Sequence, residues 1–158
     1  MKKLLVRSAL LISLISIAQE EVKILDVESP PIYPGCKRGS NAKTRRCMSN
    51  KIAKFVVRNF NKNLAKDLGL YGKQRIGVIF KIGIDGKVYG VRSRGPHPKL
   101  ENEAIRIINM LPQMDPGLQK GEPVIVRYFL PITFFVDGTP TITRQLDSIK
   151  RSLEKPLN

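Results

Sequence analysis

The sequence predicts an α+β fold, in which a small three-stranded antiparallel sheet packs with two helices and a short C-terminal extension follows. Three runs of residues are apolar at every second position, two further runs have helical spacing, and a turn signal separates the first two strand-like runs. The chain has 158 residues, which is enough for one ordinary domain with extensions.

The first residues have the pattern of a secretory signal. Lys2 and Lys3 give a charged start, and the run from Ser8 to Ala18 is apolar apart from its serines. This run is short for a membrane span, which needs about 20 apolar residues. We therefore expect residues 1–19 to be a cleaved signal peptide, and we favour cleavage over a retained inner-membrane anchor.

Residues 20–48 are expected to form an extended, proline-rich lead-in. This segment contains the two cysteines of the chain, Cys36 and Cys47. A close pair in an exported chain predicts a disulfide, here one that closes a basic loop. A metal pair is the weaker alternative, because His97 is the only histidine and no further ligand lies at metal-site spacing. No metal and no cofactor are expected.

The next elements form a domain over residues 49–136. Ser49 is a suitable N-cap for a helix over Ser49–Lys66, which carries an apolar stripe on one side. Strands are predicted over Lys73–Ile84 and Lys87–Arg94, and Asp85-Gly86 between them favours a two-residue type I′ hairpin turn. The stripe formed by Leu100, Ala104, Ile107, Ile108 and Leu111 predicts a second helix over Pro98–Met110, with His97 at its N-cap.

The third strand is predicted over Glu122–Phe135, where the even positions from Val124 to Phe134 are apolar or aromatic. Pro131 lies in its middle, and proline is confined to edge strands, first positions or bulges because it cannot donate to a ladder. The strand is therefore expected at an edge, where its backbone is available to another chain. Residues 137–158 form a tail in which Leu146, Ile149 and Leu153 have helical spacing.

The composition favours a binding protein over an enzyme. The net charge is +15, and the segment Lys37–Arg75 holds twelve Lys and Arg residues against the single acid Asp67. A nucleic-acid surface is disfavoured, because the start indicates export and no RNA-motif aromatic pattern occurs; a solvated face or attraction to an acidic partner is favoured. His97 lacks a catalytic partner, and no phosphate loop or nucleophile elbow is present.

Short motifs along most of the chain add a family resemblance. They are Ala65 with Gly69 and Gly72, the alternation from Val78 to Val88, Leu111-Pro112, Pro116-Gly117, Gly121 with Pro123-Val124, and Pro131-Ile132 with Phe134. In this order and spacing they are similar to the C-terminal domain of TonB-family proteins. The lead-in from Pro31 to Cys36, together with Cys47, resembles the version in Bacteroidetes-type envelopes.

The sequence departs from the family pattern in two places. Asn61 and Lys62 stand where many members have Tyr-Pro. The lead-in from Glu20 replaces the long span of family transducers, and at roughly 3.5 Å per residue it is too short to cross a periplasm. We therefore expect the family's binding mode, in TonB-dependent transport, to carry over to this chain more readily than its coupling to an inner-membrane motor.

The resemblance implies a periplasmic domain that pairs its edge strand with an N-terminal segment of an outer-membrane transporter, or with another envelope protein. Arg127 and Phe129, on the face away from the core, are expected to tune the selection of the partner. The alternative is a structural envelope protein in which the same edge pairs two copies into a homodimer. The residues expected to bind the partner are Val124, Val126, Arg127, Phe129, Leu130 and Pro131.

Overall fold

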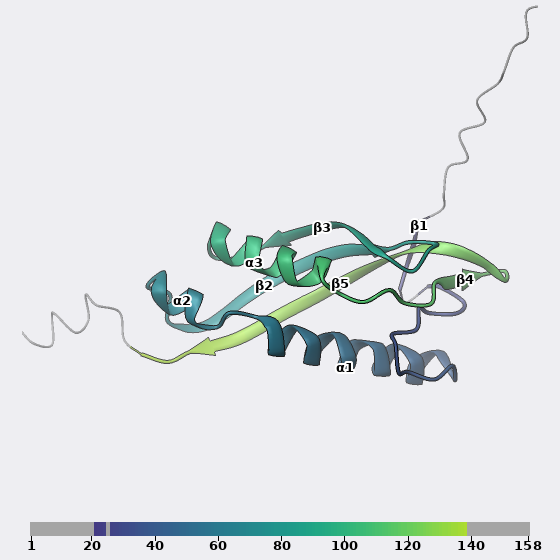
Figure 1. The fold of residues 1–158 in the computed structure, drawn as a ribbon, viewed down its shortest axis with the longest axis horizontal. Helices are drawn as coiled ribbons and strands as arrows, with labels where there is room; N and C mark the ends of the chain where they lie inside the picture. The colour runs from purple at the N-terminus through teal and green to yellow at the C-terminus, as the bar shows by residue number, and fades with distance from the viewer. Residues whose placement is uncertain (1–20, 25, 139–158) are drawn as a thin grey trace, which may run out of the picture.

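The computed structural model describes residues 21–24 and 26–138, so the predicted signal peptide and most of the tail lie outside the described residues. The helices are α1 (Asn41–Asn59), α2 (Asn63–Asp67) and α3 (Pro98–Asn109). The strands are β1 (Glu21–Lys23), β2 (Gly72–Ile82), β3 (Val88–Arg94), β4 (Gly117–Gln119) and β5 (Glu122–Val136) (Figure 1).

The strands form one sheet in the order β1-β5-β2-β3, with β4 paired to the start of β5. The β5–β2 and β2–β3 pairs are antiparallel and the β1–β5 pair is parallel. The predicted α+β class is confirmed, and β2 is the central strand of the three that the sequence predicts. β1 and β4 were not predicted, because three residues are too few to show a period of two.

The core lies between one face of the sheet and the helices. Even-numbered positions of β2 and β5 point into it, including Val78, Phe80, Tyr128 and Leu130, all of which are buried. Helix α1 contributes Met48, Ile52 and Val56, and helix α3 contributes Leu100, Ala104, Ile107 and Ile108. Odd-numbered positions of both strands lie on the opposite face, which we call the open face because no helix of the described chain packs there.

The first helix differs from its prediction. It begins at Asn41 rather than Ser49, and it ends at Asn59, so that α2 is a separate short helix. Ser40 is the N-cap residue, without a side-chain capping bond. Ser49 lies inside α1, where its hydroxyl oxygen is 2.7 Å from the hydroxyl oxygen of Tyr128 in a hydrogen bond. Ser49 therefore ties α1 to β5 instead of capping a helix.

The β2–β3 turn also differs from its prediction. The strands end at Ile82 and resume at Val88, and Asp85 has no positive φ, so the turn is not type I′. A five-residue connection is closed by the Gly83 amide, which donates to the carbonyl of Lys87 over 2.8 Å. Gly86 has φ +76°, and an added Cβ there would lie 1.7 Å from the carbonyl oxygen of Met114, so only glycine fits.

Helix α3 matches its prediction closely. It begins at Pro98, and His97 is its N-cap, with Nδ1 accepting a hydrogen bond from the Lys99 amide over 3.1 Å. The predicted position of His97 is therefore confirmed. Within the described residues no helix is both long enough and apolar enough to cross a membrane.

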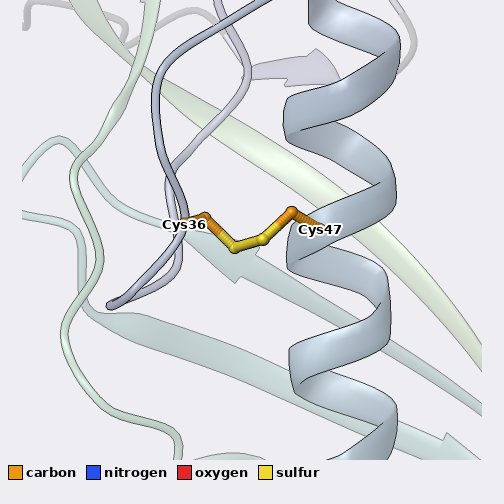
Figure 2. Close-up of a disulfide and its surroundings, with 2 residues drawn as sticks. All are labelled: Cys36 and Cys47. Carbon is orange, nitrogen blue, oxygen red and sulfur yellow. A yellow bond between two sulfur atoms is a disulfide. The ribbon is translucent and has the colours of Figure 1, made fainter.

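Cys36 and Cys47 form a disulfide, with their Cα atoms 6.0 Å apart. Figure 2 shows Cys36 on the lead-in and Cys47 on α1, so the bond joins two elements rather than closing a free loop. The lead-in is held elsewhere by bridges between Ser29 and Leu118 and between Ile32 and Asp115.

Candidate partner-binding edge

Strand β5 has two long sides, and its inner side is fully occupied. Val126–Val136 pair with Ile82–Gly72 of β2 in a single register without a shift. Pro131 lies opposite Gly77 inside this register, so the missing N–H of the proline does not interrupt the ladder. The N–H that a proline lacks would point to the outer side of β5 at position 131, so Pro131 is tolerated there.

The first part of the outer side is occupied by the chain itself. Ile125–Arg127 pair with β1 there, and the preceding residues Glu122–Val124 pair with β4. Two of the predicted partner-binding residues, Val126 and Arg127, lie in the part covered by β1, and Val124 pairs with β4. A partner reaches the outer side here only by replacing β1.

From Phe129 onward no strand of the described chain pairs with the outer side of β5. The Arg127 carbonyl accepts a hydrogen bond from the Ile24 amide over 3.1 Å, which shows that the backbone of Arg127 points outward. Because this direction alternates along a strand, Phe129, Thr133 and Phe135 also present their N–H and C=O groups outward. Pro131 presents a carbonyl only. We call Phe129–Phe135 the open edge.

Helix α1 runs alongside the open edge (Figure 1). A hollow of about 130 Å³ separates them, lined by Ala53, Val56, Val57 and the strand segment Leu130–Thr133. Val57 is 60% exposed although it is aliphatic. An extended segment placed against the open edge would therefore find an apolar surface beneath it, which we call the α1 shelf.

The shelf lies in strongly positive surroundings. Helix α1 contains six cations and no acidic residue: Lys43, Arg45, Arg46, Lys51, Lys54 and Arg58. A second hollow of about 370 Å³ lies nearer the start of the edge and is lined by Arg45 and Arg46 of α1, by Ile24, and by Ser49, Tyr128 and Phe129. This charge distribution favours acidic or neutral segments over basic ones.

The predicted side chains divide between the two faces of the sheet. Phe129 is 54% exposed on the open face, where its ring lies against Gly77, which leaves room for it. Arg127 lies on the same face and is paired with Glu21. Leu130 is buried in the core. Its own backbone groups point toward β2, so the outward groups at this place come from the adjacent residues Phe129 and Pro131. Burial and desolvation raise the pKa of Tyr128, whose hydroxyl bonds with Ser49 beneath the edge.

Sequence reasoning placed Ala53, Val56 and Val57 on a helix but did not reveal that this helix lies beside β5, and it also started the helix too late. The signal was present: Thr44, Met48, Ile52 and Val56 are spaced by four and are all buried. Extending this stripe backward from Ile52 would have placed the helix start near Asn41. Among the described residues no cluster of three or more His, Cys, Asp or Glu side chains could hold a metal ion.

Part of the chain is similar to known proteins. Residues 63–136 match the family described as Gram-negative bacterial TonB protein C-terminal. The NMR solution structure of Helicobacter pylori TonB-CTD (residues 179-285) is similar with a TM-score of 0.41 and 17% sequence identity, covering 67% of this chain and 89% of that chain. No curated protein matches the chain. Strands β2, β3 and β5 and helix α3 all lie inside the matched residues, which form a TonB-family C-terminal domain.

Proposed function

We propose that this protein is an exported binding domain that captures an extended segment of an outer-membrane transporter at the open edge of β5. The observation that carries the proposal is the run Phe129–Phe135, whose outward backbone groups have no strand partner in the described chain and lie beside the α1 shelf. The match with this family favours an outer-membrane transporter as the partner. The role needs no catalytic group.

The geometry gives each part of the edge a task. Backbone groups of Phe129, Thr133 and Phe135 would bond to the added strand, which is the usual source of affinity when a peptide extends a sheet. Alternate side chains of that strand would point toward Ala53 and Val57 on the α1 shelf. Pro131 offers no donor, so the partner loses one hydrogen bond at the middle of the edge.

The disulfide supports an oxidising compartment. Disulfides persist in the periplasm and at the cell surface and are rare in the cytosol. The bond joins the lead-in to α1, and α1 carries the shelf, so the binding surface of the protein depends on that compartment. We therefore place the protein in the periplasm.

A titration of isotope-labelled protein with N-terminal peptides of outer-membrane transporters tests the proposal. We expect the backbone amides of Phe129, Thr133 and Phe135 to shift, while those of β3 stay in place. Unchanged β5 amides at millimolar peptide would overturn the proposal.

Two matched variants sharpen this titration. Val57→Ser removes an exposed aliphatic side chain from the shelf, and Ile84→Ser removes one of similar exposure from the β2–β3 turn. We expect Val57→Ser to weaken peptide binding about threefold to tenfold, which corresponds to roughly 0.7–1.4 kcal/mol, and Ile84→Ser to leave it unchanged. Equal effects would show that the shelf is not part of the site.

The second candidate is a homodimer in which two copies pair their open edges. Phe135 is 69% exposed at the end of the edge, and an antiparallel pair centred on Pro131 would be self-complementary, as a twofold interface requires. Light scattering separates the candidates. A dimer that persists on dilution and protects the β5 amides favours this second role, whereas a monomer excludes it.

A further inference from the structure

The open face carries a hollow that the capture of a strand does not explain. It measures about 280 Å³ and lies over β2, β3 and the start of β5. Its lining is Ile79, Lys81, Tyr89, Gly90, Arg92 and Arg127. Three of these six residues are cationic and none is acidic.

A bulge in β3 gathers these side chains. Arg92 lies opposite Ile79, and Tyr89 lies opposite Lys81, with a register shift between the two pairs. Gly90 adopts φ +61° inside the bulge. Without the extra residue, Tyr89 and Arg92 would point to opposite faces, so the bulge places both on the open face.

The chain already holds one carboxylate at this hollow. Glu21 of β1 accepts from Lys81, with Nζ and Oε2 2.6 Å apart, and from Nε of Arg127. Since the strand order is β1-β5-β2, the Glu21 side chain reaches across β5 to its partner on β2. The hydrogen bond from Lys81 is the main reason that the pKa of Glu21 is lowered.

Arg92 leaves the hollow with unmatched positive charge. Its guanidinium forms no ion pair within the described chain, and its residue is exposed. Lys81 and Arg127 share the single carboxylate of Glu21, so three cations face one anion. Charge complementarity therefore calls for an anionic ligand, and a guanidinium favours a planar group such as a carboxylate.

We propose that Lys81, Arg92 and Arg127 form a carboxylate-binding site for an acidic residue of the captured segment, and that Glu21 is its internal occupant. The inference rests on the proposed capture at β5. The incoming strand would take the place of β1 along Ile125–Arg127, run parallel to β5 as β1 does, and continue along the open edge. Its acidic residue would lie opposite Ile125, where Glu21 lies now.

The lengths of the two strands favour this exchange. Strand β1 pairs only three residues with β5. A partner that starts at Ile125 and extends to Phe135 would gain the β1 pairing and the open edge together. It would also bring a carboxylate to the cations that Glu21 leaves. The acidic residue therefore fixes the register of the partner as well as adding affinity.

The experiment uses two capped threonine-rich peptides, long enough to span Ile125–Phe135, that begin with glutamate or with glutamine. We expect the glutamate peptide to bind the full chain about tenfold more tightly. Its binding should release the amide signals of Glu21 and Lys23 to random-coil positions. Arg92→Gln should reduce the preference for glutamate to about twofold or less, because the unmatched cation is gone.

Two further variants complete the test. Arg94→Gln is the matched control, since Arg94 lies on the same strand and face but opposite Gly77 and outside the hollow. It should keep the preference. Glu21→Gln should strengthen binding of the glutamate peptide about threefold to tenfold, because the internal competitor is neutral.

The outcomes separate this inference from the proposed function. If both peptides shift the β5 amides with equal affinity, the carboxylate site is wrong and strand capture stands. If neither peptide binds, capture fails, and the Glu21→Gln protein is then titrated with glutarate while the Arg92 side-chain signals are followed. Unmoved Arg92 signals overturn the carboxylate site as well.

Discussion

The two halves of β5 have the same alternating pattern but different neighbours. Ile125–Arg127 pair with β1 on the outer side, and Val124 before them pairs with β4, whereas Phe129–Phe135 have a strand partner only on the inner side. From Val126 onward the even positions are buried or half-buried and the odd positions are exposed, whereas Ile125 in the first half is also buried. The strand's own sequence therefore makes it a strand, and the other segments of the chain decide where its edge is open.

Local features of the chain hold β4 and β1 beside β5. β4 folds back on β5 through Lys120 and Gly121, which have φ of 51° and 81°. β1 is held by Glu21, whose carboxylate pairs with Lys81 and Arg127. Neither cause extends past Arg127. The open edge is thus the part of β5 that local turns and ion pairs do not reach.

The largest expected effect comes from proline placed on each side of the strand. Leu130→Pro removes an N–H that points toward β2 and a buried side chain, so we expect a loss of about 3 kcal/mol or more, or no folding. Thr133→Pro removes an outward N–H only, so stability should change by less than about 1 kcal/mol while peptide binding falls at least about tenfold. Urea denaturation and peptide titration measure the two effects. Similar stability losses in both variants would show that the outer side is not open.

Removal of the disulfide should have the next largest effect. The loop between Cys36 and Cys47 spans 11 positions, and the chain-entropy model gives about 3 kcal/mol for closing a loop of this size. We expect the double Cys→Ser variant to lose about that much in urea denaturation. Because Ala53, Val56 and Val57 of α1 lie beside Leu130–Thr133, amide protection should fall more at Leu130 and Ile132 than at Val126. Uniform loss of protection along β5 would contradict this division.

The hydrogen bond between Ser49 and Tyr128 lies at the junction of the two halves. Tyr128→Phe leaves the ring and its contact with Phe80, whose ring centroid is 5.2 Å away, but removes the hydroxyl. We expect a loss of about 1 kcal/mol. Ser49→Ala should cost a similar amount, and the double variant should cost less than the sum. Strict additivity would show that the two hydroxyls do not interact in solution.

Lowering the pH should have the smallest effect on stability, and this effect should be confined to the half of β5 that β1 covers. The pKa of Glu21 is lowered in the folded protein, chiefly by the hydrogen bond from Lys81, so its contribution is present above the ordinary value of 4.5. That contribution is lost as the pH falls through the lowered pKa. Hydrogen-exchange protection factors at Arg127 and Ile24 should therefore fall below pH 4.5. Glu21→Gln should remove this pH dependence, and its persistence in that variant would assign it elsewhere.

Lowering the pH should also weaken a contact of a second carboxylate, Glu103, because its pKa is lowered in the folded protein as well. Glu103 accepts from Arg106 and from the Asn61 amide, and the hydrogen bond from Arg106 is the main cause of its lowered pKa. This contact ties α3 to the connection between α1 and α2. The contact is far from β1 in the sequence. Hydrogen-exchange protection of the Asn61 amide therefore reports the Glu103 contact separately from the Glu21 contact.

The sequence predicted the central fold well because its signals are long. β2 and β5 alternate over 11 and 15 residues, and α3 has a proline start and a continuous stripe. The open edge followed from Pro131, a residue whose chemistry restricts it. Short or context-dependent features were missed: β1 and β4 are three residues long, and the Asp85-Gly86 turn is set by the approach of Met114.

The candidate site was predicted in part for the same reason. Phe129 and Pro131 lie on the open edge, but Val124, Val126 and Arg127 are covered, because β1 comes from a remote segment that periodicity along β5 cannot reveal. Helix α1 was expected, but its reach back to Asn41 depends on the lead-in to which it is joined. The position of the shelf is therefore a tertiary property rather than a local one.

The disulfide also determines how the domain would respond to tension. A pull applied at Glu21 along the chain first loads β1, and then the bridges at Ser29 and Ile32. The load next reaches Cys36, where a covalent bond passes it to the middle of α1. Peeling from this end therefore uncovers the outer side of β5 first, then withdraws Val27, Ile32 and Tyr33 from the core, and stops at Cys36.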